Sequence, residues 1–214
     1  MVEAALLFVA TAGAAGMALP VAPSVPPGTV SRSMDNALEV ARERYRDGDP
    51  AGTSTVLRPA LETKGAVQGR TRSSADLLFG MAQRDLGNWN LASQSFTKVR
   101  TSGGPLAPWG AWYEAEMDYQ RGRNAIAARE CAAYRQAWPD GPHVDACLFL
   151  EGDAYAGVGQ RGASLAAYKQ LLEDDPESPR AESVRLAVAL AIAQTSPKEG
   201  IPLLQDLVIG HTYH

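Results

Sequence analysis

The sequence has few of the residues on which cross-linking or metal binding usually depends. Its 214 residues include 2 cysteines and 3 histidines, which excludes a small domain held together by many disulfides. Charges nearly balance, with 20 Lys and Arg against 24 Asp and Glu for a net charge of −4. Because a nucleic-acid-binding domain shows a clustered basic surplus, we expect no nucleic-acid partner. The apolar fraction of 45% is that of a folded chain.

Motifs for catalysis are also lacking. The sequence carries no Ser-His-Asp elbow, P-loop or zinc-protease motif. Gly157–Gly162 fits the pattern G-x-G-x-x-G, but it follows a predicted helix, whereas a dinucleotide site needs a preceding strand. Cys131, His143 and Cys147 lack the paired spacing and the fourth ligand of a zinc site. We therefore predict no catalytic residue, no metal site and no cofactor.

The N-terminal segment differs from the rest of the chain. Residues 1–19 are nearly all apolar or small, and a stretch rich in Pro, Ser and Val follows at 20–27. This pattern resembles a secretory signal peptide, although Glu3 stands where Lys or Arg is usual. We expect residues 1–30 to be a signal peptide with a Pro-rich linker, and 31–214 to be the folded domain. The resemblance implies a periplasmic protein that meets the membrane only through its export segment.

The remainder of the sequence is periodic. Four glycines mark the pattern, and a small residue follows each of them after five positions and a bulkier one after nine. The last three glycines lie 35 and 37 residues apart, close to the ~34-residue period of a helix–turn–helix repeat. The glycines are Gly48, Gly87, Gly122 and Gly159; the small residues are Thr53, Ala92, Ala127 and Ser164; the bulkier ones are Leu57, Phe96, Cys131 and Tyr168.

Each position has a physical role in a helical hairpin. Glycine allows the left-handed backbone of a tight turn, the small residue lets the second helix approach the first, and the bulkier residue fills the space between them. Pro105, Pro139 and Pro176 follow the second helices, and proline cannot continue a helix. A fifth unit fits residues 180–209. The sequence thus predicts an all-α protein, a right-handed α-solenoid of about five hairpins.

From about Asp35 to Ile209 this pattern resembles the tetratricopeptide repeat (TPR) superfamily. Pro105–Tyr113, Trp138–Pro142 and Asp175–Ala181 are further similar to the N-terminal superhelical region of bacterial soluble lytic transglycosylases and to other periplasmic TPR proteins. Those transglycosylases cleave peptidoglycan with a separate C-terminal domain. Their catalytic Glu precedes a Ser with a Gly-rich stretch downstream, which neither Glu-Ser pair of this sequence has, so no catalytic residue is assigned here.

A binding surface is the remaining functional candidate. In such solenoids the first helices of the hairpins line the concave side, where large aromatic side chains with polar tips anchor partners. We expect a protein or peptide partner there, with peptidoglycan as the alternative ligand. Packing of Trp109 and Trp112 between units two and three is the competing interpretation. The predicted concave residues are Leu77, Met81, Arg84, Trp109, Trp112, Glu116, Tyr119, Phe149 and Asp153.

The two cysteines lie at the junction of units three and four. Cys131 is on the second helix of unit three and Cys147 on the first helix of unit four, about equally far from the turn at Pro139. Antiparallel packing of these helices brings the two side chains together. The sequence leaves two alternatives open, a disulfide in an exported protein or two buried thiols that serve as small apolar residues.

Overall fold

The computed structural model describes residues 27–63 and 69–211. Within these ranges it contains ten α-helices and no strand. The helices form five consecutive pairs: α1 (Pro27–Arg46) with α2 (Pro50–Glu62), α3 (Arg70–Asp85) with α4 (Trp89–Thr101), α5 (Ala107–Gln120) with α6 (Asn124–Ala137), α7 (Val144–Gly157) with α8 (Arg161–Asp174), and α9 (Ala181–Thr195) with α10 (Pro197–His211). The predicted all-helical solenoid of five hairpins is confirmed.

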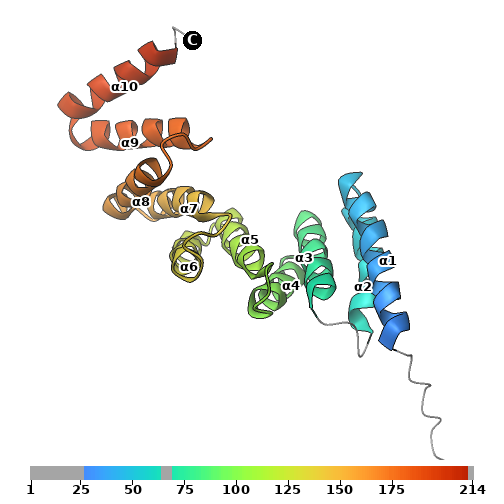
Figure 1. The fold of residues 1–214 in the computed structure, drawn as a ribbon. Coiled ribbons are helices and arrows are strands. Elements are labelled where there is room, and N and C mark those ends of the chain that lie inside the picture. The colour runs from blue at the N-terminus through green and yellow to red at the C-terminus, as the bar shows by residue number, and fades with distance from the viewer. Residues whose placement is uncertain (1–26, 64–68, 212–214) are drawn as a thin grey trace, which may run out of the picture.

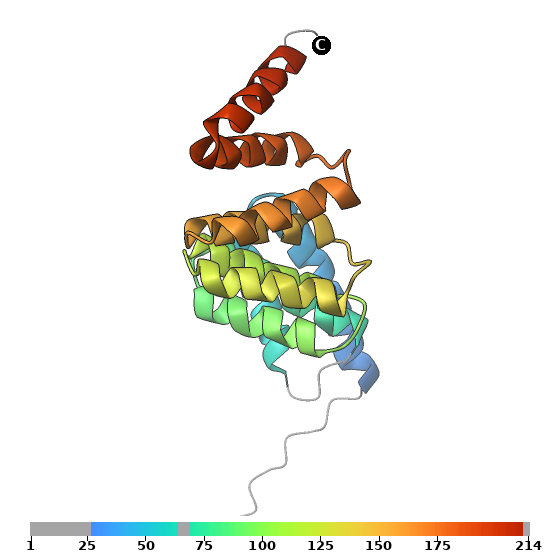
Figure 2. The same cartoon turned by 90° about the vertical axis from the view of Figure 1, so that its left-hand side faces the viewer.

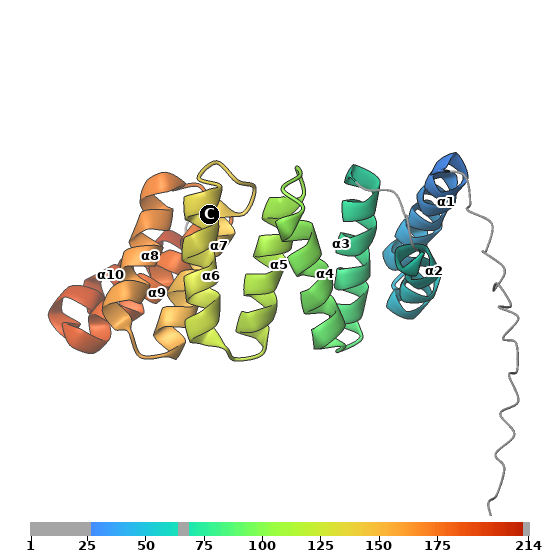
Figure 3. The same cartoon turned by 90° about the horizontal axis from the view of Figure 1, so that it is seen from below.

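The hairpins stack in a single curved row. Each helix packs against the next one along the chain, and Figure 3 shows the row running from α1 to α10. The first helices of successive hairpins also contact one another, in the pairs α1 with α3, α3 with α5, and α5 with α7. Close spacing on that side bends the row toward it, so α1, α3, α5 and α7 lie along its concave side (Figure 1). We call the surface of these four helices the inner face.

The repeat positions read from the sequence have the roles expected of them. Backbone φ angles at Gly48, Gly87, Gly122 and Gly159 are 76°, 73°, 72° and 75°, so all four turns use the left-handed conformation. The small and the bulkier residues that follow the glycines are all buried, with side chains at most 5% exposed. The three prolines at 105, 139 and 176 lie in the connections after α4, α6 and α8.

The hydrophobic core is divided among the junctions between hairpins. One cluster joins units one and two through Met34, Leu57 and Phe79, and another joins units four and five through Tyr168 and Val184. Figure 2 shows the helices of the middle units as successive layers. Because each unit buries its apolar side chains against its neighbours, stability depends on stacking, as in other repeat proteins.

The prediction for the N-terminal end of the row remains open. The predicted export segment lies almost entirely in residues 1–26, outside the described residues, and α1 begins at Pro27. At the other end, α9 and α10 leave Leu186, Leu190 and Ile201 between 46% and 50% exposed. No described helix is both long and apolar enough to cross a membrane.

Candidate binding surface on the inner face

All nine predicted binding residues lie on first helices and are half-buried. They are distributed over α3, α5 and α7 of units two, three and four, so each side chain is held by packing and still keeps part of its surface exposed. Their role in binding stays a prediction. What the structure adds is the environment of each side chain, which divides the inner face into three regions.

The first region is an apolar hollow where α1, α3 and α5 meet. It has a volume of about 350 Å³, within the usual range of sites that enclose part of a ligand. Three of the predicted residues, Leu77, Met81 and Trp109, form part of its wall. The full lining, to which we refer as the apolar hollow, is Arg42, Ser74, Leu77, Leu78, Met81, Leu106, Trp109 and Tyr113.

Five of these lining residues were not predicted from the sequence. Tyr113 was predictable, since it lies four positions after Trp109 on the same helix face. Its ring stacks on Phe96 with a centroid distance of 5.3 Å and an interplanar angle of 20°. Arg42 comes from unit one, whose sequence matches the repeat pattern weakly, so nothing in the pattern placed it beside units two and three.

A polar network borders the hollow and links three units. The Tyr45 hydroxyl on α1 donates to Asp85 at 2.6 Å, and the Arg84 guanidinium donates to Asp85 at 3.1 Å and to Glu116 at 2.9 Å. Arg84 also lies over the Tyr113 ring, 5.3 Å from its centroid. Burial, followed by the hydrogen bond to Asp85, raises the pKa of Tyr45 to about 12. The network therefore holds Arg84 and Glu116 in fixed positions beside the hollow.

The second region is an aromatic cluster around His143, which lies in the connection between α6 and α7. Trp109 meets its ring edge-on at a centroid distance of 4.4 Å, and Trp112 stacks on it at 5.2 Å and 17°. The His143 backbone N–H donates to the Tyr134 hydroxyl at 3.1 Å. Burial lowers the pKa of His143, which favours the neutral imidazole. Its Nε2 atom is buried without a hydrogen-bond partner among the described residues.

The structure gives the two tryptophans a further contact beside the two interpretations that the sequence left open. Both rings contact a histidine from the junction of units three and four. One face of Trp112 is therefore covered by His143, while Trp109 also lines the apolar hollow. Sequence reasoning missed His143 in this role because the position of a loop side chain depends on how α6 and α7 pack.

The third region pairs aromatic rings with charges on α7 and its neighbours. Asp153 accepts a hydrogen bond from the Tyr168 hydroxyl. Burial and then the charge of Asp153 raise the pKa of Tyr119. Arg180 lies 5.8 Å from the centroid of the Phe149 ring and 3.3 Å from a carboxylate oxygen of Asp145. Tyr119 of unit three and Asp153 of unit four therefore lie close enough to interact.

The cysteines meet as their helices predict. Cys131 on α6 and Cys147 on α7 are both buried in one cluster, and both are free thiols in the structure. A hydrogen bond between them, followed by burial, raises the pKa of the Cys131 thiol. The disulfide, one of the two alternatives that the sequence left open, is not formed in this structure. In the described part of the chain, no group of three His, Cys, Asp or Glu side chains is placed to hold a metal ion.

Comparison with known proteins identifies the fold. The chain matches no protein-family model and no curated protein. Among solved structures it is similar to MamA residues 41 to the end from Desulfovibrio magneticus RS-1, with a TM-score of 0.67 and 16% identity over 84% of this chain and 95% of that one. MamA AMB-1 gives a TM-score of 0.65 and 15% identity over 86% and 92%.

A Podosopora anserina protein described as a kinesin light chain with nearly identical TPR-like repeats is equally similar, with a TM-score of 0.66 and 15% identity over 84% and 95%. The class of protein defined by these similarities is a TPR-like α-solenoid. At such low identity they show the fold alone, so the function must be argued from the surface.

Proposed function

We propose that this chain is a non-catalytic binding module that holds a segment of a protein partner along its inner face. The observation that carries the proposal is the apolar hollow, which units one, two and three build together. A solenoid exposes an extended concave surface by construction, and a hollow on that surface gives a partner segment a defined anchor point.

The chemistry of the hollow favours a peptide with one large apolar side chain. Its wall presents the aliphatic and thioether groups of Leu77 and Met81 beside the ring of Trp109. Burying such a side chain contributes roughly 1.5–3 kcal/mol. Arg42 at the same hollow supplies a charge for a backbone carbonyl or an acidic group of the partner.

The alternative is a peptidoglycan-associated module like the superhelical region of a soluble lytic transglycosylase. The sequence segments around Trp109 and Trp138 support it, and aromatic rings are the side chains that stack on sugars. Against it stands the contact of Trp112 with His143 at 5.2 Å, which covers a face that a sugar ring would need. The peptide proposal is therefore preferred, and the cell-envelope location that both share rests on residues 1–19.

Selection from a random peptide library displayed on phage, followed by affinity measurement on the selected peptides, tests the proposal. The variant Met81→Glu places a charge in the hollow. Its matched control is Leu91→Glu, which makes the same kind of change at a half-buried position on α4 outside the hollow. Circular dichroism checks that both variants fold. Purified peptidoglycan sacculi are offered in parallel to the same three proteins.

We expect selected peptides to share a large apolar residue and to bind Met81→Glu at least about tenfold more weakly, the equivalent of ~1.4 kcal/mol, while Leu91→Glu binds normally. Equal loss in both variants, or no enrichment at all, contradicts the proposal. Retention on sacculi that Met81→Glu leaves intact supports the peptidoglycan alternative.

A further inference from the structure

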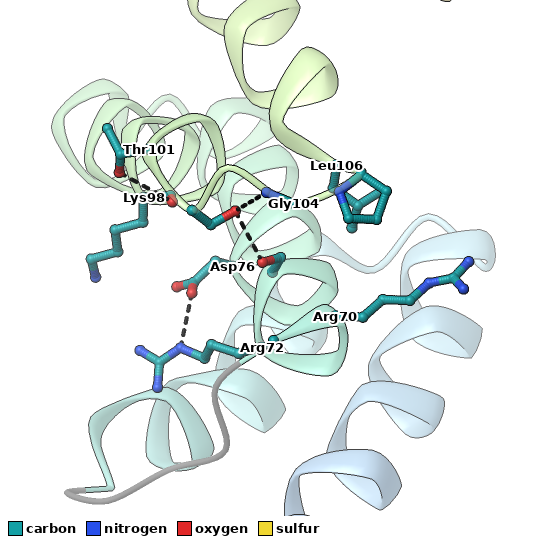
Figure 4. A pocket seen from close by; sticks show the side chains of 11 residues that line it. Arg70, Arg72, Asp76, Lys98, Thr101, Gly104 and Leu106 are labelled. Carbon is teal, nitrogen blue, oxygen red and sulfur yellow. Dashed lines mark hydrogen bonds and ion pairs between the residues drawn. The ribbon is translucent and has the colours of Figure 1, made fainter.

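A second hollow lies at one end of the hairpin of unit two, apart from the inner-face site. It occupies about 540 Å³ between the start of α3, the end of α4 and the connection to α5 (Figure 4). Leu106 lines both hollows, so the two are neighbours. Its volume suits a ligand of one or two sugar rings, and its polar residues differ in kind from those of the apolar hollow.

Helix α3 begins at this hollow with an unusual accumulation of positive charge. Its first turn has no acidic residue, and Gly69 at its N-cap supplies no side-chain hydrogen bond. Arg70 and Arg72 occupy the first turn instead. Because helix N-termini carry partial positive charge and usually attract acidic side chains, this end of α3 lacks the negative charge that it would normally have, which favours an anion.

Two cations of the hollow remain available to a ligand. Arg72 donates through Nε to Asp76 at 2.8 Å, which leaves its two terminal amino groups for other acceptors. The Lys98 ammonium has no partner among the described residues. Figure 4 shows Lys98 and Arg72 on the same side of the hollow as the Asp76 carboxylate, with Arg70 pointing away from them.

Asp76 requires a hydrogen-bond donor, which a simple anion does not have. Its side chain is 5% exposed, and it accepts from Arg72 through one oxygen only. The other oxygen, Oδ1, is buried and has no partner among the described residues. A buried acceptor without a donor is unfavourable, so a ligand that brings an O–H group to this carboxylate gains a hydrogen bond that a bare anion cannot make.

We propose that this hollow binds an anionic sugar, with Lys98 and Arg72 contacting its carboxylate or phosphate and Asp76 accepting from a hydroxyl group. The cations and the start of α3 select for negative charge, and Asp76 selects for hydroxyl groups. The site shares no lining residue with the apolar hollow except Leu106. The proposal for this site is therefore independent of the proposal that the apolar hollow binds a peptide.

Isothermal titration calorimetry on the whole chain with four probes tests this assignment. Glucuronate and glucose 6-phosphate carry both features and distinguish a carboxylate from a phosphate. Sulfate is an anion without a hydrogen-bond donor, and glucose has hydroxyl groups without charge. We expect at least one anionic sugar to bind and glucose not to bind. Sulfate should bind at least about tenfold more weakly than the sugar, because it lacks one charge-assisted hydrogen bond to Asp76.

Three variants locate the binding. Lys98→Ala is expected to weaken the anionic sugar about tenfold or more, and Asp76→Asn to remove most of the preference over sulfate. Lys169→Ala removes the same charge from an exposed position on α8 and should change nothing. Lys98→Ala alters only an exposed side chain, so the test survives if Asp76→Asn fails to fold. No binding of either anionic sugar, sulfate binding as tightly as the sugars, or equal losses for Lys98→Ala and Lys169→Ala overturns the proposal.

Discussion

At the scale of single residues, the stack depends on how closely paired helices approach. In unit four the approach is set by Gly152, because a methyl group at this position would lie 2.3 Å from the Tyr168 ring. That ring is only 4% exposed, and its hydroxyl is bonded to Asp153, so it cannot move aside. Gly80 and Phe96 repeat the arrangement in unit two, where the same distance is 2.6 Å.

We expect Gly152→Ala to lower the free energy of unfolding by about 1–3 kcal/mol, the usual cost of overpacking a core. Urea unfolding followed by circular dichroism measures it. Gly162→Ala on α8 is the matched control, since nothing lies within 4 Å of the added methyl group. There alanine should be neutral or stabilise by up to ~1 kcal/mol through its higher helix propensity. Similar losses at both sites would show that backbone effects, and not the Tyr168 contact, set the cost.

The pairing of a small residue on the first helix with a bulky one on the second explains an irregularity of the repeat. Unit three has Ala115 at the position that glycine occupies in units two and four, and its partner in the same cluster is the small Cys131 rather than an aromatic ring. An alignment of the repeats shows that a larger residue at 115 is matched by a smaller one at 131. The environment of His143 was not readable, because it depends on a loop conformation that no periodic pattern encodes.

At the scale of elements, the junction of α6 and α7 combines an ion pair, two buried thiols and an aromatic cluster. Arg135 on α6 donates to buried Glu151 on α7 through two nitrogens, at 2.8 and 3.2 Å. Beside this ion pair lie the two thiols, which helix placement predicted to meet. The sequence could place both cysteines on facing helices because helix period and loop length were known, but it could not give the separation of the sulfur atoms.

We predict that oxidation with diamide links Cys131 to Cys147 and stabilises the chain by ~3 kcal/mol, the value typical for a loop of this size. Mass spectrometry should show the loss of two hydrogen atoms, and urea unfolding should show the gain. Because the pKa of the Cys131 thiol is raised, reactive thiolate is scarce, and oxidation should be faster during refolding than in the native chain. Cys147→Ser should abolish both effects. A cross-link that destabilises would mean that the helices must separate to form it.

At the scale of the whole molecule, the binding surfaces follow from stacking rather than from any single hairpin. The apolar hollow takes residues from three helices of three successive units, and the second hollow takes them from α3, α4 and the connection beyond. The general architecture of such solenoids was enough to place all nine predicted residues on first helices. It could not delimit either hollow, because the angle between neighbouring units sets which side chains converge.

The location of the whole chain depends on the segment that precedes the stack. If residues 1–19 direct export, the thiols of α6 and α7 fold in a compartment where disulfides persist, and envelope ligands reach the inner face. A fusion of residues 1–30 to alkaline phosphatase without its own signal tests this, since that enzyme becomes active only where its disulfides form. We predict phosphatase activity in bacterial cells that express the fusion.

The variant Leu7→Arg should abolish that activity, because a charge interrupts the apolar run that export machinery requires. Ser24→Arg adds the same charge in the Pro-rich stretch beyond the run and should leave activity unchanged. A native fusion that accumulates without activity would place the chain in the reducing cytoplasm. The cysteines would then serve as small apolar residues of the junction between α6 and α7, and the envelope ligands considered for the inner face would lose their basis. The proposal of a peptide partner for the apolar hollow would be unaffected.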